Sequence, residues 1–475
     1  MSGHERVKAG SKMQYIENKT YAEITVGDSA QLTRTLKQQD IELFAVMSGD
    51  VNPAHVDLEY AKTDMFHGLI AHGMWGGALI STVLGTELPG PGTIFLNQSL
   101  RFEAPVRLGD TVVVRVEVTD KRPKGRLLLE CTCVNQEGKM VTEGVAEVIA
   151  PEEKMRRPRI VLPEAHLHVQ GAQYARLIKA THDLAAVRTA VVHPCDSLSI
   201  AGAMAAARQG IIVPVLVGPR KRIEDAARAA GQSIDGVEII DTPHSHAAAA
   251  TAVALVRSGK VEALMKGALH TDELMEAVVD TALGLRSERR MSHVYVLDVP
   301  TYSKPLLVSD TAINIYPDLT AKRDIVQNAI DLAHALGIAQ PKVAILSATE
   351  TVNPRIISTV DAAALCKMAD RGQITGGLID GPLAFDNAIS PAAAATKGII
   401  SHVAGDADIL VAPNLDAANM IAKQLIYLAG ADAAGIVLGA KVPIVMTSRA
   451  DSAVTRLASC ALAQLFINGP RPSVS

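Results

Sequence analysis

One short stretch of the chain, MSGDVNPAHVDLEYAKTDMF at 47–66, combines residue types that can move protons. Asp50 and His55 lie within six residues of each other, on either side of Pro53. Proline restricts the backbone and therefore fixes the spacing of the two side chains. A carboxylate and an imidazole on one rigid loop can hold a water molecule, one removing its proton and the other supplying a proton to the product. This pair suits the addition of water to a double bond conjugated to a carbonyl group.

That reaction also needs a group that stabilises the negative charge on the carbonyl oxygen. Residues 72–88 are mostly apolar and predict one helix. If the helix begins near His72 or Gly73, its unpaired N–H groups and positive dipole end would face the carbonyl oxygen. Glycine at position 73 would also let a ligand approach closely. An ordinary structural interpretation stays open, because Asp-x-Asn-Pro is common turn chemistry and both His67 and His72 could simply cap or pack.

The combined pattern resembles the MaoC-like (R)-specific enoyl-CoA hydratases of the hotdog fold. Their motif is a small residue, Gly-Asp-x-Asn-Pro, an aliphatic or small residue, and His; it is matched here by Ser48, Gly49, Asp50, Asn52, Pro53 and His55. The resemblance covers essentially residues 15–150. It implies that Asp50 and His55 are the catalytic acid/base pair, and that Asn52 and the Gly73 amide contact the substrate.

Long strands follow the predicted helix. Residues 111–120 change polarity at every second position, which indicates a half-buried antiparallel strand, and residues 127–149 predict a hairpin. A single apolar helix followed by such strands predicts a sheet wrapped around that helix. Residues 151–164 are charged and contain three prolines, so we expect them to link a hotdog domain at 1–150 to a second domain at 165–475.

The second domain has the pattern of an α/β fold. Short apolar runs alternate with helical stretches, which predicts strands covered by helices on both faces of a sheet. Only 3% of residues are aromatic against 48% hydrophobic, and this balance favours helices on a parallel sheet. No GxGxxG follows a predicted strand and no Walker loop occurs, so neither dinucleotide nor ATP binding is supported.

Six stretches of this domain resemble the phosphate acetyltransferase and phosphate butyryltransferase family. They occur in order over almost all of 165–475: GIIVPVLVGP, MKGALHTDELM, LLVSDTAINIYP, DGPLAFDNAIS, ILVAPNLDAANM and PIVMTSRADS. The family has two subdomains with a cleft between them. It moves an acyl group between CoA sulfur and phosphate, which requires an anion site, a cation near the oxyanion and a base for the thiol.

The resemblance places Ser448 and Arg449 in this cleft as catalytic residues. The forked guanidinium of Arg449 suits phosphate or an oxyanion. Further substrate-binding candidates follow strands or lie in a basic cluster: Lys266, His270, Asp310 and Arg286.

The chain departs from the family beyond the Ser-Arg pair. The acetyltransferases place an acidic residue several positions later, in the next helix, as the thiol base. Here that zone contains Val454 and Thr455, and the nearest carboxylate is Asp451. We therefore expect Asp451 to be the base, unless the base is dispensable or turnover is weak.

The amino-acid composition indicates where the protein is located and which partners it binds. The formal net charge of −4 predicts no broad attraction to nucleic acid or to an anionic membrane. Five cysteines without a C-x-x-C pair, a charged N-terminal stretch and no long apolar run predict a cytoplasmic protein with reduced thiols. We expect no permanently bound cofactor or metal, acyl-CoA and inorganic phosphate as substrates, and a homo-oligomer larger than a dimer.

Three alternatives remain open at this point. The hotdog domain could be a thioesterase, although the Asp-x-Asn-Pro-x-His pattern favours a hydratase. The α/β domain could be a non-catalytic or weakly active scaffold that assembles hydratase dimers. A dehydrogenase of the related isopropylmalate type is the weakest of the three, since a cofactor fingerprint is missing.

Overall fold

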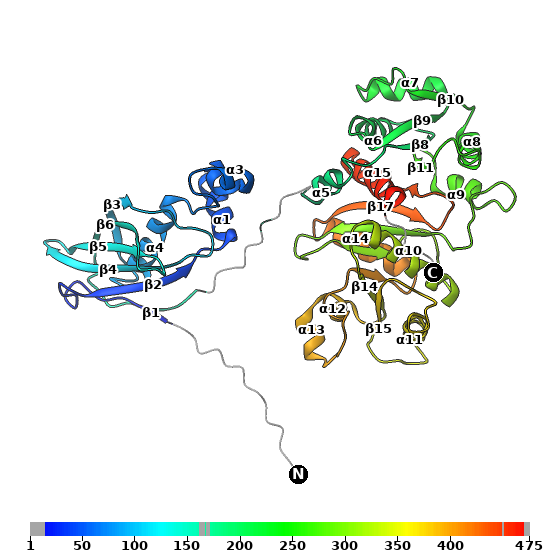
Figure 1. Cartoon of the computed structure of the whole chain (residues 1–475). Coiled ribbons are helices and arrows are strands. Elements are labelled where there is room, and N and C mark those ends of the chain that lie inside the picture. The colour runs from blue at the N-terminus through cyan, green and yellow to red at the C-terminus, as the bar shows by residue number, and fades with distance from the viewer. Residues whose placement is uncertain (1–14, 161–166, 168–171, 449–450, 470–475) are drawn as a thin grey trace, which may run out of the picture. The chain divides into compact units, whose positions relative to one another are not determined.

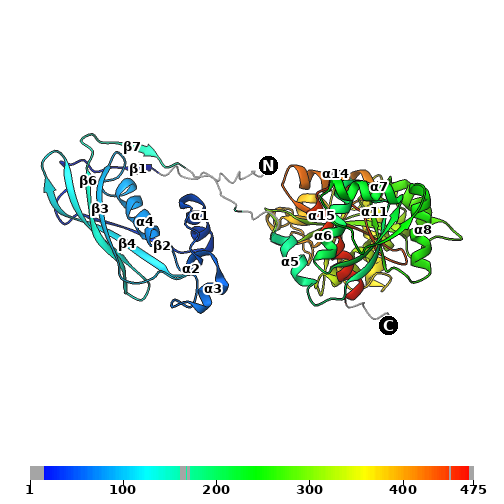
Figure 2. The ribbon, with the colours of Figure 1, turned by 90° about the horizontal axis from the view of Figure 1, so that it is seen from above.

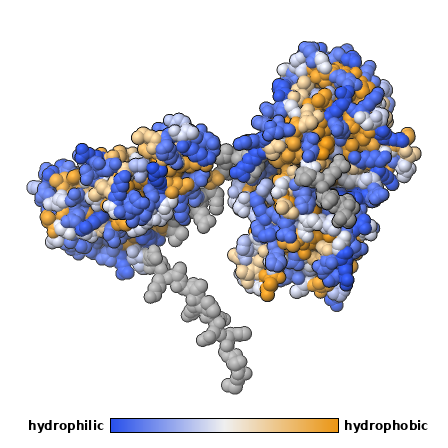
Figure 3. Space-filling model, in the orientation of Figure 1, coloured by the Kyte–Doolittle hydropathy of each residue, from blue (hydrophilic) through white to orange (hydrophobic). Residues whose placement is uncertain are grey.

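A computed structural model describes residues 15–160, 167, 172–448 and 451–469. The chain divides into two compact units, Met1–Leu167 and His168–Ser475 (Figure 1). The face shown in Figure 3 is largely hydrophilic, with apolar patches on both units. Among the described residues, no helix combines the length and apolar character needed to cross a bilayer.

The N-terminal unit is built on a five-stranded antiparallel sheet in the order β2-β4-β5-β6-β3. The long helix α4 (Gly73–Thr86) lies against this sheet (Figure 2) and buries Trp75, Ile80 and Val83 in its core. This arrangement confirms the predicted hotdog fold. The strands are β2 (Ser29–Thr35), β3 (Ile94–Phe102), β4 (Thr111–Arg122), β5 (Arg126–Val134) and β6 (Met140–Ile149).

Three short helices lie between β2 and α4: α1 (Gln38–Ser48), α2 (Pro53–Val56) and α3 (Leu58–Thr63). Gly49 ends α1 in the left-handed region, with φ of 74°, which glycine adopts without steric cost. Pro53 begins α2, where its missing N–H is not needed. The segment between Gly49 and Pro53 is therefore held at both ends.

The predicted linker at 151–164 begins too early. Within it, β7 (Arg156–Pro158) pairs with β1 (Tyr15–Glu17) in a two-stranded antiparallel sheet. The Tyr21 amide donates to the Pro151 carbonyl at 2.9 Å, and the Asn18 side chain bonds the 153–155 backbone. Prolines do not prevent this short edge pairing. Residues 151–158 thus pack with the hotdog unit, whereas residues 161–164 lie outside the described residues.

The described part of the C-terminal unit contains an eleven-stranded sheet in the order β10-β9-β8-β11-β18-β17-β12-β13-β16-β14-β15. The strands are β8 (Val187–Val192), β9 (Ile212–Gly218), β10 (Glu238–Asp241), β11 (Ala263–Lys266), β12 (Ser292–Asp298), β13 (Leu306–Ser309), β14 (Lys342–Leu346), β15 (Leu378–Leu383), β16 (Ile409–Val411), β17 (Asp432–Leu438) and β18 (Ile444–Val445).

Two halves of this sheet meet at β17 and β18. The first five strands in the order run parallel, and β18 then pairs antiparallel with β17 through only two residue pairs. Helices cover both faces, as the sequence predicted, and form three apolar clusters with the sheet. These helices are α5 (Ala172–Ala180), α6 (Ser197–Arg208), α7 (Arg220–Ala229), α8 (Ser245–Arg257), α9 (Thr271–Val279), α10 (Leu319–Ala335), α11 (Ile357–Asp370), α12 (Phe385–Ile389), α13 (Pro391–Thr396), α14 (Leu415–Tyr427) and α15 (Ala453–Asn468).

The cysteines of the structure are all free. Cys131 and Cys133 lie on the same buried face of β5, because every second residue of a strand points to the same side. Burial raises the pKa of the Cys131 thiol to about 11 and that of Cys133 to about 12. Thiols with such high pKa values are poor nucleophiles at neutral pH, so we give the two cysteines a packing role.

Candidate functional site

The structure brings Asp50 and His55 together, as their spacing predicted. Asp50 lies between α1 and α2, and its carboxylate Oδ1 accepts a hydrogen bond from the Asn52 amide at 3.1 Å. His55 lies on α2. Ligand atoms of Asp50, His55 and His72 all lie within 4.8 Å of one another. This compact group can hold one water molecule between a carboxylate and an imidazole.

The hydrogen bonding of His55 fixes which nitrogen can act as a base. Its Nδ1 lies 3.0 Å from the Ile70 carbonyl oxygen, which can only accept, so Nδ1 carries the proton. The lone pair is therefore on Nε2. His55 lines a pocket of about 400 Å³ with Phe102, Cys133 and Thr142, which gives this imidazole an apolar cavity for a substrate.

Gly73 lies at the start of α4 and lines the same pocket as His55. Amides in the first turn of a helix have no intrahelical acceptor, so they are available to an oxyanion. A Cβ atom at position 73 would meet the Phe102 ring at 3.3 Å, closer than most contacts of real side chains. The position thus favours glycine for two reasons, the tight packing and the open approach to the helix end.

Asn52 has a structural task beside its predicted contact with substrate. Its side-chain Oδ1 accepts a hydrogen bond from the Ala54 amide at 3.2 Å and so caps α2. Asparagine is among the best residues for this position. The capping bond orients the helix turn that carries His55.

His72, for which the sequence left capping or packing open, is central to the geometry. Its ring stacks on Phe44 and lies 4.0 Å, centroid to centroid, from the His55 ring. Its Nε2 lies 3.0 Å from the backbone oxygen of Asp50. A histidine directly before a predicted helix start was the available signal. His67, in contrast, is exposed.

In the C-terminal unit, Ser448 and Asp451 lie just beyond β18. The Ser448 amide donates to the Asp451 carboxylate at 2.6 Å. Burial raises the pKa of Asp451, against the lowering effect of this hydrogen bond and of the nearby Arg456 and Lys266 charges. A carboxylate with a raised pKa is a stronger base. Arg449, predicted to be catalytic, lies outside the described residues.

Arg456 on α15 is a functional neighbour that the sequence did not reveal. Its side chain is only 2% exposed and donates to the Thr447 hydroxyl and to the Ser448 carbonyl, both at 3.0 Å. Gly202 of α6 makes room for it, because a Cβ there would lie 2.7 Å from the Arg456 Cβ. Ser448 is thus held by Asp451 on its amide and by Arg456 on its carbonyl.

Lys266 is the last residue of β11, the strand next to β18, and His270 follows that strand. Because β11 and β18 are parallel, their carboxyl ends meet at one edge of the sheet, where α/β proteins commonly bind ligands. Lys266 is buried and its charge acts on Asp451. His270 is exposed at the start of α9. Lys266 therefore lies near Ser448, whereas no contact of His270 with this group is found among the described residues.

Asp310 was predicted to bind substrate, but its carboxylate is already fully engaged. It is 4% exposed and accepts five hydrogen bonds, from the amides of His293, Ala312, Ile313 and Asn314 and from the Asn314 side chain. Five donors satisfy the acceptor capacity of a carboxylate. We therefore correct its role: Asp310 folds the loop that follows β13.

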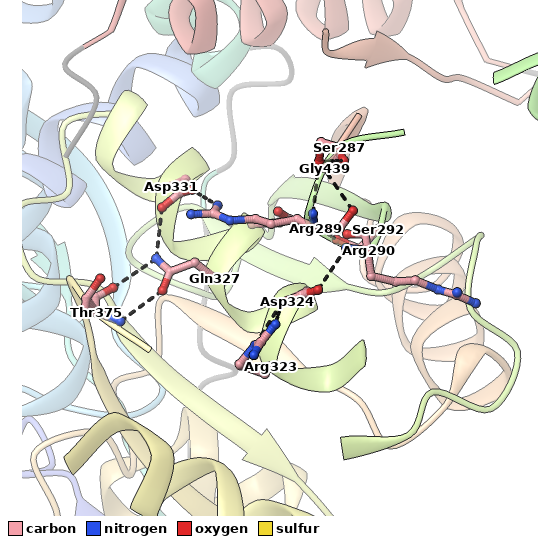
Figure 4. Close-up of polar contacts among 11 residues, drawn as sticks. Ser287, Arg289, Arg290, Ser292, Arg323, Asp324, Gln327, Asp331, Thr375 and Gly439 are labelled. Atoms are coloured by element: carbon pink, nitrogen blue, oxygen red, sulfur yellow. Dashed lines mark hydrogen bonds and ion pairs between the residues drawn. The ribbon is translucent and has the colours of Figure 1, made fainter. Parts of the chain in front are cut away.

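That loop borders a hollow of about 950 Å³ that is lined by α9, α10 and residues of the segments 286–291 and 312–318. Three arginines reach it: Arg286, Arg289 and Arg290. Arg289 pairs with Asp331 and points toward α10, while the Arg290 side chain extends the opposite way (Figure 4). The Arg290 amide donates to Asp324 at 2.9 Å.

The arginines differ in which guanidinium nitrogens already donate a hydrogen bond to the protein. Arg286 donates through Nε to the Val279 carbonyl at 2.5 Å, and Arg290 donates through Nε to Asn314 at 2.9 Å. Both terminal nitrogens of Arg290 have no partner among the described residues. Arg286, predicted to bind substrate, does line the hollow, and Arg290 joins it as a cation free to meet an anionic group.

Comparison with known proteins decides the family. Residues 245–464 match the family model described as phosphate acetyl/butaryl transferase. A phosphate acetyltransferase from Rhizobium meliloti is 60% identical over 297 residues, which are 62% of this chain and 94% of that protein. The chain belongs to the phosphate acetyl/butyryl transferase family. A branched-chain phosphotransacylase structure from Enterococcus faecalis is 28% identical, with TM-score 0.52, and covers 60% of this chain and 100% of its own.

The N-terminal unit has its own relatives. Residues 22–137 match the model of a MaoC like domain. An R-hydratase from Pseudomonas aeruginosa is 47% identical, with TM-score 0.32, and covers 33% of this chain and 100% of its own. The chain therefore joins a MaoC-like hotdog domain to a member of the phosphate acetyl/butyryl transferase family, as the motifs predicted.

Proposed function

We propose that this chain is a bifunctional acyl-CoA enzyme: its hotdog unit hydrates trans-2-enoyl-CoA to the (R)-3-hydroxyacyl thioester, and its C-terminal unit exchanges acyl groups between CoA and phosphate. The observation that carries the proposal is that His55 and the Gly73 end of α4 line one pocket, while a ligand atom of Asp50 lies within 4.8 Å of one of His55. The second activity rests on membership of the transferase family.

In hydration, one water molecule sits between the Asp50 carboxyl group and His55 Nε2. Its hydroxyl oxygen bonds to the β-carbon of the enoyl group while a proton passes through the acid/base pair to the α-carbon. The thioester oxygen carries negative charge between these events. The Gly73 N–H and the positive end of α4 stabilise that charge, which is larger in the transition state than in the substrate.

In acyl transfer, phosphate oxygen attacks the thioester carbonyl, the C–S bond breaks and CoA leaves as thiolate. Arg449 balances the charge of phosphate and of the tetrahedral oxyanion, and Ser448 donates a hydrogen bond to the carbonyl oxygen or the sulfur. Asp451 removes the thiol proton in the reverse direction. Arg290 and Arg286 meet phosphate groups of CoA in the hollow lined by α9 and α10.

The proposal includes assembly into a homo-oligomer larger than a dimer, located in the cytoplasm and needing no resident cofactor or metal. β3 lies at an edge of the hotdog sheet and exposes Ile94, Phe95 and Phe102 by 56%, 44% and 52%. An apolar edge strand of this length is a surface that proteins normally cover. Light scattering is expected to give a mass above that of two chains, and a monomeric mass would contradict this part.

The test uses the purified full-length chain. Crotonyl-CoA should lose its enoyl absorbance without thiol release, and chiral analysis should find the (R)-alcohol. With added phosphate, at least one of acetyl-, butyryl- and 3-hydroxybutyryl-CoA should yield acyl phosphate and free CoA. Thiol release from crotonyl-CoA without hydration would point to a thioesterase.

A second candidate function, a hydratase on an inactive scaffold, is favoured by one observation. The zone that carries an acidic residue in the acetyltransferases holds Thr455 here, whose hydroxyl lies 3.0 Å from that of Ser452. A chain that hydrates crotonyl-CoA and binds CoA, but makes no acyl phosphate from any of the three thioesters, would support the scaffold.

A further inference from the structure

His72 lies where the Asp50 segment, the His55 helix and the start of α4 meet in the hotdog unit. It is the residue directly before α4, it is 2% exposed, and its ring centroid lies 4.9 Å from that of Phe44 and 4.0 Å from that of His55. Phe44 belongs to α1, which leads into the Asp50 segment. One imidazole thus contacts the elements that carry the acid, the base and the oxyanion donor.

The hydrogen bonding of His72 assigns its protonation. Nε2 lies 3.0 Å from the Asp50 backbone oxygen, and a carbonyl can only accept, so Nε2 is the nitrogen that carries hydrogen. Nδ1 is buried and has no partner among the described residues. The His72 ring lines the substrate pocket, but its Nε2 is engaged with the backbone and its Nδ1 is buried. This excludes His72 as the general base and leaves a mechanical role.

We propose that His72 is a positioning residue for hydration: it holds the Asp50 segment and His55 at fixed positions relative to the first turn of α4. The inference rests on the proposed hydratase activity. Asp50 is otherwise anchored by bonds within its own loop, from the Asp50 amide to the Ser48 hydroxyl and from the Asn52 amide to the Asp50 carboxylate. Only the His72 bond ties its backbone to the helix start in the described residues.

Small displacements of such a group are costly. A misplacement of about 1 Å in a catalytic constellation can lower the rate by ~10²-fold. Because the substrate-binding pocket is formed largely by other residues, losing the His72 bond should lower kcat far more than it raises KM. A residue that merely packed would lower both through loss of folded enzyme or of the pocket.

Two variants separate the ring from the hydrogen bond. His72→Phe keeps a ring against Phe44 and His55 but has no N–H donor, whereas His72→Gln keeps an N–H donor and loses the ring. We expect His72→Phe to lower kcat for crotonyl-CoA by ~10–100-fold with KM within about threefold. His72→Gln should recover at least ~10-fold of that loss. His67→Asn, an exposed neighbour changed to a residue that tolerates positive φ, is the control and should match wild type.

The outcomes are distinguishable. Wild-type kcat in His72→Phe, or equal impairment of the Phe and Gln variants, overturns the inference while leaving the hydratase assignment intact. A wild-type chain that does not hydrate enoyl-CoA removes the proposed function, and the inference falls with it. Thermal unfolding of each variant reports whether the hotdog unit is folded, so a loss of folded protein is not mistaken for a loss of kcat.

Discussion

The two sites of this chain are constructed in opposite ways. In the hotdog unit, acid and base lie on one short loop whose ends are fixed by Gly49 and Pro53, and a single helix end completes the site. In the C-terminal unit, the group around Ser448 draws Lys266 from the end of β11, Ser448 from the segment after β18 and Arg456 from α15. A local site depends on turn chemistry, whereas a dispersed site depends on the whole sheet.

This difference predicts how each site fails. The local site should be sensitive to its own few residues and insensitive to changes elsewhere in the chain. The dispersed site should respond to substitutions far along the sequence, at positions where helices hold the strand ends in place.

The largest effect is expected from Arg449→Ala. Acyl-phosphate formation should fall by about 10³-fold or more, because the phosphate and the tetrahedral oxyanion lose their cation. Hydration of crotonyl-CoA in the same sample should be unchanged. Retention of acyl transfer within about tenfold of wild type would show that the Ser-Arg pair does not carry the chemistry.

Arg290→Ala should have an intermediate effect on binding. Its two terminal nitrogens are the donors we expect to meet a phosphate group, and charge-assisted bonds contribute about 1.5–3 kcal/mol each, so KM for acyl-CoA should rise by about tenfold or more. Arg289→Ala is the matched control, since Arg289 is already paired with Asp331. Steady-state kinetics that show equal KM changes for both variants would contradict the assignment.

Gly202→Ala tests dependence on distant packing. The added methyl would lie 2.7 Å from Arg456 Cβ and 2.8 Å from its Cδ. We expect a loss of about 1–3 kcal/mol in the stability of the C-terminal unit, a lower thermal midpoint, and slower acyl transfer. Gly85→Ala in α4 is the control, because its Cβ meets nothing within 4 Å. Its stability should stay the same or rise slightly.

Asp451→Asn should have the smallest effect, visible as a change with pH. Asn retains an oxygen for the Ser448 amide but cannot take a proton. Transfer of the acyl group from acyl phosphate to the CoA thiol should therefore slow mainly at low pH and recover as thiolate forms at higher pH. An unchanged pH profile would leave the base unassigned.

The same variant has a predicted stability signature. Burial raises the pKa of Asp451, so the folded state binds the proton more tightly than the unfolded state. The stability from this carboxyl group is therefore present below its unfolded pKa and is lost as pH rises through the folded pKa. Asp451→Asn should be more stable than wild type at neutral pH and nearly equal at low pH in thermal unfolding. Lower stability at neutral pH would contradict the sign.

The sequence predicted the hotdog helix, the β5–β6 hairpin and the acid/base loop because each depends on neighbours in the chain. It failed at Asp310, where the residue type and its place after a strand suggested ligand binding. Only the folded loop shows that five N–H groups already occupy that carboxylate. The sequence did not predict the buried position of Arg456 for a related reason: its burial depends on Gly202 in another helix.

The linker error has the same origin. Charge and proline content correctly mark a place where regular structure is weak, but they do not reveal that Arg156–Pro158 pairs with a strand at the other end of the unit. Pairing between segments far apart in sequence leaves no local pattern. The roles of Ser448 and Arg449 are likewise predicted from a family resemblance and not from their spacing.

The most direct test of the central claim, two independent active sites in one chain, measures both activities in a single preparation of the Asp50→Asn enzyme. The account predicts that hydration of crotonyl-CoA falls by ~10²–10⁴-fold, as expected for loss of one acid/base partner, while acyl-phosphate formation stays at the wild-type rate. His55→Ala should repeat the result. Near-normal hydration in either variant, or loss of both activities together, would contradict the account.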